Sequence, residues 1–157
     1  MATSRTRSVI TAVHRLSLTE FRNYAMLRLE LDDRPVVLSG GNGAGKTNLL
    51  EAVSFLAPGR GLRRARLAEI GRRGLCNGNG LSWAVAATLR TGVDDVNIGT
   101  GLATTETGNN GRRVVRINGT DAPSQSALGD HLTVAWLTPE MDRLFSEAAA
   151  ARRRFLD

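Results

Sequence analysis

The stretch GGNGAGKT, residues 40–47, decides the fold, because it meets the phosphate-loop pattern of a glycine, four residues and then Gly-Lys-Thr. We call these residues the glycine loop. The apolar run before it, residues 35–39, predicts a short strand covered on both faces. Residues 46–57 after it carry apolar side chains at helical spacing (Leu49, Leu50, Val53, Leu56), and predict a helix that ends at Pro58. Strand, glycine loop and helix in this order are the context in which the pattern binds nucleotide phosphates.

The residue types of the loop suit a triphosphate and Mg²⁺. Glycines let backbone N–H groups turn inward around phosphate oxygens, and the helix that begins at Gly45 adds its positive partial charge. Lys46 is the single lysine among 21 basic residues, and a slim ammonium fits inside the loop where a planar guanidinium is too broad. We expect Lys46 to reach the outer phosphates of ATP and the Thr47 hydroxyl to bind Mg²⁺. The predicted nucleotide-binding residues in this stretch are Gly40, Gly41, Asn42, Gly43, Ala44, Gly45, Lys46, Thr47 and Asn48.

Several other stretches have the pattern of strands. Alternating or continuous apolar residues predict strands at residues 13–18, 25–31, 81–90, 114–117 and 132–137. Turn signals stand at Asp32-Asp33, Asp94-Asp95, Asn109-Asn110-Gly111 and Asn118-Gly119. Residues 92–111 are polar and rich in Gly, Thr and Asn, and the block from residue 81 to residue 119 predicts an antiparallel meander.

Two further helical stretches are predicted. Leu67 and Ile70 give a short helix within residues 58–74 an apolar edge. Thr138 can cap a second helix with Pro139 at its first position, and this helix continues through residues 148–157.

The acidic residue that ATP hydrolysis requires is not evident. Such a residue stands at the end of a second buried strand, where it holds Mg²⁺ and polarises water. Residues 27–33 end in two aspartates, but they alternate in polarity and precede the glycine loop, which predicts an exposed hairpin. The run that ends at Leu137 continues as Thr138-Pro139-Glu140, and no other long apolar run ends in Asp or Glu. The sequence therefore predicts half of an ATPase site, and we expect little ATPase activity from this stretch alone.

Composition narrows the class of protein. The 157 residues have a net charge of +6, which favours anionic partners, and 41% of them are hydrophobic, as in globular chains. The single cysteine, Cys76, excludes an internal disulfide and fits a reducing cytoplasm. His14 and His131 have no neighbours at metal-ligand spacing, so we predict no zinc or iron site. No apolar run approaches the length of a membrane span. The first eight residues, MATSRTRS, are polar and basic, and we predict a flexible N-terminal extension over residues 1–12.

Arginines are concentrated in residues 58–74, where they face one acid, Glu69. The six are Arg60, Arg63, Arg64, Arg66, Arg72 and Arg73. Contacts from these side chains to phosphates would give sequence-independent, salt-sensitive DNA binding. A solvated surface in a chain that uses arginine in place of lysine is an equally good interpretation. Aromatic residues are not interleaved with the arginines, so stacking on single-stranded bases is not indicated.

Four segments together resemble the RecF family of bacterial recombination mediators, within the ABC and SMC-like ATPase group. They are LTEFRNY at residues 18–24, GGNGAGKTNLLEAVSFLAPGRGLR at residues 40–63, WLTPEM at residues 136–141 and RRRFLD at residues 152–157. The resemblance covers nearly the whole chain from residue 13, whereas the residues before it depart from the family pattern. RecF proteins are longer, and their later portion carries the signature motif and the Walker B acids. Residues 13–157 therefore resemble the N-terminal, Walker A part of an ABC-type ATPase head.

The resemblance implies a fold and a function. The fold is α/β, a P-loop NTPase head with a mixed sheet and an antiparallel β subdomain, here as an incomplete lobe. The function is that of a cytoplasmic, nucleoid-associated protein that forms an ATP-dependent homodimer on gapped or damaged DNA. It acts with RecO and RecR in recombinase loading and supports the SOS response, with weak ATPase activity in the full-length family. Arg22 and Asn23 match positions close to the nucleotide, and residues 138–140 match a loop that senses the γ-phosphate.

Two other interpretations stay open from the residues alone. One is the N-terminal half of an SMC-like or RecN-like head, which heptad repeats after residue 157 would favour. The other, from a different class, is a non-enzymatic basic module that binds nucleic acid and uses the glycine loop only structurally.

Overall fold

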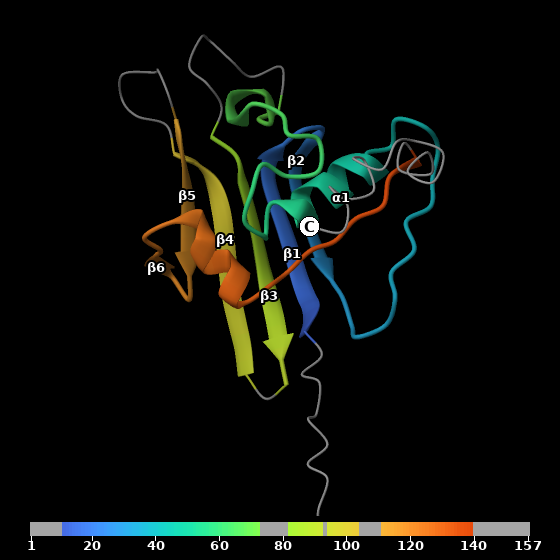
Figure 1. The fold of residues 1–157 in the computed structure, drawn as a ribbon. Coiled ribbons are helices and arrows are strands. Elements are labelled where there is room, and N and C mark those ends of the chain that lie inside the picture. Colours follow the sequence, from blue (N-terminus) through green and yellow to red (C-terminus); the bar gives the residue numbers. More distant parts are fainter. Residues whose placement is uncertain (1–10, 73–81, 93, 104–110, 140–157) are drawn as a thin grey trace, which may run out of the picture.

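A six-stranded antiparallel sheet dominates the structure, a computed structural model that describes residues 11–72, 82–92, 94–103 and 111–139 (Figure 1). Its strands are β1 (Thr11–Phe21), β2 (Tyr24–Glu30), β3 (Ala84–Thr91), β4 (Asp94–Ala103), β5 (Arg112–Ile117) and β6 (Thr120–Asp121), in the order β2-β1-β3-β4-β5-β6. The described residues also contain the α-helix α1 (Lys46–Ser54) and the 3₁₀ helices η1 (Leu67–Glu69) and η2 (Gln125–Asp130).

The core lies on the face of the sheet that α1 and η2 cover. Side chains alternate along the central strands, so that Leu16 and Leu18 of β1 point into the core with Val85 and Leu89 of β3. The three aromatic rings of Phe21, Phe55 and Trp83 pack together at the C-terminal end of α1, with centroids 5.2–6.1 Å apart. Phe21 meets the other two rings edge-on, and the Phe55 and Trp83 rings are tilted to each other. The core therefore fixes the C-terminal end of α1 against the last residue of β1 and the residue before β3.

The hairpin and the meander are confirmed. β1 and β2 pair antiparallel through the turn at Arg22-Asn23, with Phe21 opposite Tyr24. β3, β4 and β5 follow one another in the sheet, and Asn118-Gly119 forms the predicted turn into β6, both residues with positive φ. The prediction of a turn at Asp94-Asp95 was wrong, because both residues lie at the start of a strand. This strand, β4 (Asp94–Ala103), was not predicted within the polar residues 92–111.

Two predicted strands are not strands within the described part of the chain. Residues 35–39 form no ladder, and Val37 is 88% exposed where burial on both faces was expected. Residues 132–137 are not in a strand either, and Leu137 is 78% exposed. The physical reason is that a strand exists only beside another strand, and the described chain brings none to either segment. Leu132 still packs against the core, and the residues after it leave the sheet (Figure 1).

The boundaries of the other predicted elements also shift. α1 ends at Ser54 and not at Ala57, since Phe55 caps it, and Leu50 is 54% exposed where the apolar face was expected. The short helix with an apolar edge is found as η1, followed by the buried Ile70. β1 begins at Thr11, inside the predicted extension of residues 1–12. Several predictions fall on residues that the structure does not describe. They concern residues 1–10, Arg73, Cys76, the turn at 109–110 and the helix predicted beyond residue 139.

Candidate nucleotide-binding site

The glycine loop turns sharply into α1, and its glycines make this turn possible. Gly40, Gly43 and Gly45 have φ angles of 144°, 83° and 104°, which are left-handed values that side chains strongly disfavour. α1 begins within the last two residues of the loop, at Lys46, with no side chain capping its first turn and no acidic residue in it. The backbone N–H groups of this first turn and the positive end of the helix dipole are therefore available to an anion.

The Lys46 side chain folds back against the first two residues of the glycine loop. Its Nζ atom donates hydrogen bonds to the carbonyl oxygens of Gly40 at 2.7 Å and Gly41 at 2.8 Å. These two bonds leave one of the three donors of the ammonium free for another acceptor. The free donor of the ammonium and the backbone N–H groups at the start of α1 together have the chemistry that phosphate oxygens require. Thr47 is exposed beside it, where its hydroxyl can face a metal ion held by the same phosphates.

The β1–β2 turn supports the loop from below. A Cβ atom added at Gly45 would lie 2.6 Å from the Tyr24 hydroxyl and 2.7 Å from Nδ2 of Asn23, so only glycine allows this approach. Asn23 Oδ1 also accepts a hydrogen bond of 2.9 Å from Nδ2 of Asn48, the residue after Thr47. Asn23 is therefore brought to the glycine loop, as the resemblance to RecF implied, and its direct role toward a nucleotide remains a prediction.

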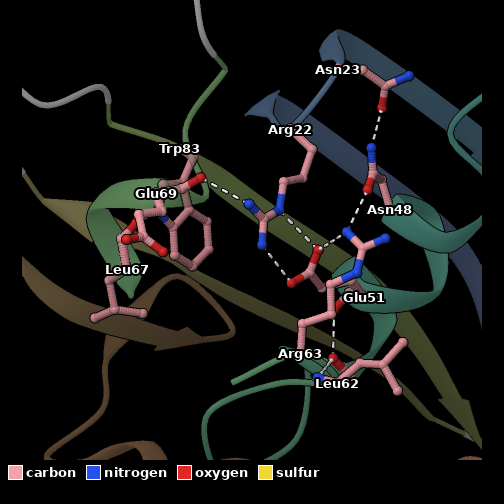
Figure 2. A network of polar contacts seen from close by, with 10 residues as sticks. Arg22, Asn23, Asn48, Glu51, Leu62, Arg63, Leu67, Glu69 and Trp83 are labelled. Atoms are coloured by element: carbon pink, nitrogen blue, oxygen red, sulfur yellow. Dashed lines mark hydrogen bonds and ion pairs between the residues drawn. The ribbon is translucent and has the colours of Figure 1, made fainter. Parts of the chain in front are cut away.

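Arg22 points the other way, into a buried ion pair (Figure 2). Its Nε and NH2 atoms donate to the two carboxylate oxygens of Glu51 at 2.9 and 2.7 Å, and its NH1 atom donates to the Glu69 carbonyl at 2.8 Å. The Glu51 side chain is fully buried, and Arg63 NH1 lies 3.2 Å from the same carboxylate. Arg22 thus links the end of β1 to α1 and η1. A contact between Arg22 and the nucleotide remains a prediction.

The arginine-rich segment has two kinds of side chain. Arg63 donates to Asn48 at 2.8 Å as well as to Glu51, and Arg72 lies 3.8 Å from Glu20. Arg60, Arg64 and Arg66 are exposed, and no ion pair to a described residue is recorded for them. We call residues 58–66 the arginine loop. The predicted DNA contacts of all six arginines remain predictions, and Arg73 lies outside the described residues.

Two residues of this region were not found from the sequence. Glu51 holds the two arginines beside the nucleotide site, and its only signal was a single acid in the helix between arginine-bearing segments. Arg113 is the other: it hydrogen-bonds through every nitrogen to neutral acceptors of α1, the arginine loop, β4 and η2. A signal for it existed, because the strand period of two places Arg113 on the same face as the core residues Val115 and Ile117.

The described residues offer no separate metal centre. Among them, no group of three His, Cys, Asp or Glu side chains lies close enough to hold a metal ion. His14 instead bonds Asp33 through Nε2 at 2.7 Å.

The loop that was expected to sense the γ-phosphate, residues 138–140, is described only to Pro139. In the described part of the chain, no helix has the length and apolar character that a membrane crossing requires.

Taken together, a glycine loop that holds its own lysine, an uncapped helix behind it and an antiparallel sheet beside it define the P-loop NTPase fold with the head architecture of ABC ATPases. Comparison with solved structures confirms this fold class. The recombination mediator protein RecF bound to ATP, described as part of the RecFOR pathway, superposes with a TM-score of 0.75 at 25% identity, over 94% of this chain and 38% of that one. Its counterpart titled RecF-ATPrS superposes with a TM-score of 0.76 at the same identity.

Curated sequences give the family. The DNA replication and repair protein RecF of Rhizobium meliloti (strain 1021) is 55% identical over 143 residues, which are 91% of this chain and 37% of that protein. The protein of the same name from Caulobacter vibrioides (strain ATCC 19089 / CIP 103742 / CB 15) is 53% identical over 143 residues, 90% of this chain and 36% of that protein. No family model matches the chain. This chain matches the N-terminal portion of RecF proteins over about nine tenths of its own length, and it spans somewhat over a third of the length of these relatives.

Proposed function

We propose that this protein is an ATP-binding DNA replication and repair protein of RecF type. In this proposal ATP with Mg²⁺ binds at the glycine loop, and the nucleotide-bound protein forms a homodimer that holds DNA at gaps or damage. It works with RecO and RecR to load recombinase, and it supports the SOS response in the cytoplasm. The support comes from the kinship with RecF proteins and from the geometry of the loop.

One observation carries the nucleotide part of the proposal. The loop presents three left-handed glycines, a lysine ammonium and an uncapped helix start at the same place, beside an asparagine and a tyrosine of the β1–β2 turn. A structural loop would have no use for uncapped donors, because unpaired backbone N–H groups are costly unless water or a ligand satisfies them. A triphosphate satisfies them and also neutralises the ammonium.

The residues present fit ATP and Mg²⁺ in a simple division of roles. The backbone N–H groups from Gly43 to Thr47 would hold the β- and γ-phosphate oxygens, and Lys46 would exchange a carbonyl of the loop for a phosphate oxygen. The Thr47 hydroxyl would be a ligand of the metal, which supplies neutralisation of phosphate charge. Asn23 and Tyr24 would fix the loop from below, since they already contact Gly45.

Lys46→Ala tests the nucleotide part. We expect this substitution in the full-length protein to weaken ATP binding by at least about tenfold, because it removes a charge-assisted contact of more than about 1.4 kcal/mol. Isothermal titration with a non-hydrolysable ATP analogue and Mg²⁺ measures the loss. Arg90→Ala is the matched control, because Arg90 is an exposed cation of β3 that pairs with Asp95 in the β3–β4 hairpin. Unchanged ATP affinity in Lys46→Ala would favour the non-enzymatic module instead.

The DNA part is tested with the same variant. We expect duplex DNA with a single-stranded gap to bind the full-length protein more tightly with ATP, and Lys46→Ala to remove this difference. We also expect little ATPase activity from residues 1–157 alone, because the sequence does not show the acid that polarises the attacking water. Turnover by this stretch at the rate of the intact protein would contradict that expectation.

A further inference from the structure

A cleft of about 500 Å³ opens between the arginine loop and the edge of β5, apart from the glycine loop. Its walls come from residues 59–60 and 65–67 on one side and from residues 112–115 and 121–125 on the other. β4 pairs with β5 along its whole length on one edge, whereas on the other edge β6 pairs with it only at Arg116 and Ile117. The first residues of β5 therefore border the cleft with no strand on that second edge. None of the predicted residues of the glycine loop lines it.

The cleft is strongly positive. Arg60, Arg66, Arg112 and Arg113 line it, and the single acidic residue of its walls, Asp121, is bonded to Arg116 at 2.7 Å. Within the described chain no ion pair is recorded for any of these four arginines. Arg22, Arg63 and Arg116, in contrast, form ion pairs of 2.7–3.2 Å. Several like charges around one hollow raise the potential inside it and draw anions to it.

Arg113 keeps its charge there at neutral pH. Its partners are the Thr100 hydroxyl, the Gln125 amide oxygen and the carbonyl oxygens of Phe55, Ala57 and Gly59, and none of them is a carboxylate. Burial lowers the pKa of Arg113 to about 10, which is still well above neutrality. Its cation also stands at the C-terminal end of α1, where exposed carbonyl groups stabilise it.

The arginine loop is fixed before any ligand binds. Leu62 N donates to the Ser54 hydroxyl at 2.7 Å, and Ser54 in turn donates to the Glu51 carbonyl at 2.6 Å. The Gly59 carbonyl accepts from Arg113, and Gly61 lies against the Phe55 ring. Arg60 and Arg66 therefore project from a backbone whose position is set by α1 and β5, so binding an anion would require ordering of side chains only.

We propose that the cleft between the arginine loop and β5 binds a phosphate group through Arg60 and Arg66, in the field of Arg113, at a site distinct from the nucleotide loop. Two exposed guanidinium groups can hold the oxygens of one phosphate in bidentate fashion, and the Ser124 and Gln125 side chains border the same hollow. The group is a backbone phosphate of nucleic acid or a free phosphate, since both present the same oxygens. The inference deepens the proposed DNA binding and rests on it only for the source of the phosphate.

The test replaces the two exposed arginines in the full-length protein, as Arg60→Gln/Arg66→Gln. The matched control, Arg28→Gln/Arg34→Gln, removes the same charge from exposed arginines at β2 and the segment after it. Inorganic phosphate is titrated by NMR and a duplex oligonucleotide by fluorescence anisotropy at several salt concentrations. We expect the cleft variant alone to weaken phosphate binding about tenfold and to lower the salt slope of DNA binding by about 2, one for each lost contact.

Each outcome decides the matter. Selective weakening of DNA binding supports the cleft with backbone phosphate as its ligand, and selective weakening of inorganic phosphate alone supports it with free phosphate as its ligand. Equal behaviour of the cleft variant and the control for both probes overturns the inference, even if ATP-dependent DNA binding is found. Lys46→Ala separates the two proposals, because it should abolish ATP binding and leave phosphate binding in the cleft unchanged.

Discussion

The glycine loop and the arginine loop both turn at left-handed glycines, but neighbouring side chains pack against them at different points. Both contain left-handed residues: Gly43 and Gly45 in the first, Gly59 and Gly61 in the second. A Cβ atom at Gly43 would meet nothing within 4 Å, whereas one at Gly61 would lie 2.7 Å from the Phe55 ring. Each loop also contains one glycine of the other kind, because a Cβ atom at Gly45 would lie 2.6 Å from the Tyr24 hydroxyl and one at Gly59 would meet nothing within 4 Å. The packed glycine therefore lies at the helix end of the glycine loop, whose tip at Gly43 is exposed, and in the middle of the arginine loop. This difference suits one loop that presents side chains and another that presents its backbone to a ligand.

The buried Glu51 between the two loops gives the largest expected effect. Arg22→Ala would leave this carboxylate with only the half-exposed Arg63, and removing one member of a buried pair costs about 3–5 kcal/mol. We expect a loss of unfolding free energy near the lower end of that range, measured by urea denaturation followed by circular dichroism. The effect would show that both loops depend on one ion pair for their relative position.

Two further variants check that interpretation. Arg28→Ala breaks an exposed pair with Glu30 and should cost no more than about 1 kcal/mol. The double variant Arg22→Ala/Glu51→Ala should be less destabilised than the sum of the single variants, because it leaves no buried charge without a partner. Additive losses, or a loss for Arg22→Ala as small as that for Arg28→Ala, would show that the pair does not hold the loops.

Matched glycine substitutions test the comparison directly. Gly61→Ala must strain a residue with φ of 71° and also displace the Phe55 ring, whereas Gly43→Ala strains a residue with φ of 83° and touches nothing. Left-handed alanine costs about 1–2 kcal/mol, and crowding a packed ring adds about 1–3 kcal/mol. We expect thermal denaturation to show a clearly lower melting temperature for Gly61→Ala than for Gly43→Ala. The opposite order would mean that the glycine loop is the more constrained of the two.

Alternation in the sequence was enough to predict the sheet where polar and apolar residues take turns. β1, β2, β3 and β5 were found in this way, and Asn118-Gly119 marked the turn before β6. β4 was missed because glycines and Thr100 interrupt the apolar set Val96, Ile98 and Leu102, although its spacing is that of a strand. The polar composition of residues 92–111 was taken as the sign of a loop. The spacing of the apolar residues by two was the better indicator of a strand here.

The two false strands show a limit of a different kind. Residues 35–39 and 132–137 have the apolar character of central strands, and local sequence cannot tell whether a neighbour is present to pair with them. For the site, the pattern located the glycine loop, because all its members are consecutive. It could not locate Glu51 and Arg113, since their partners lie tens of residues away in the chain and only the fold brings them together.

The smallest expected effect concerns the direct link between the loops. The Asn48 side chain donates to Asn23 beside the glycine loop and accepts from Arg63 of the arginine loop. Asn48→Ala loses two exposed hydrogen bonds but gains helix propensity, so we expect its unfolding free energy to fall by less than about 1 kcal/mol. A double-mutant cycle with Arg63→Ala should nevertheless give a coupling energy of about 0.5–1 kcal/mol, because the two side chains touch. The cycle of Asn48→Ala with Arg60→Ala is the control, since no hydrogen bond joins that pair. Equal coupling energies in both cycles would show that the hydrogen bond from Arg63 to Asn48 does not couple the two loops.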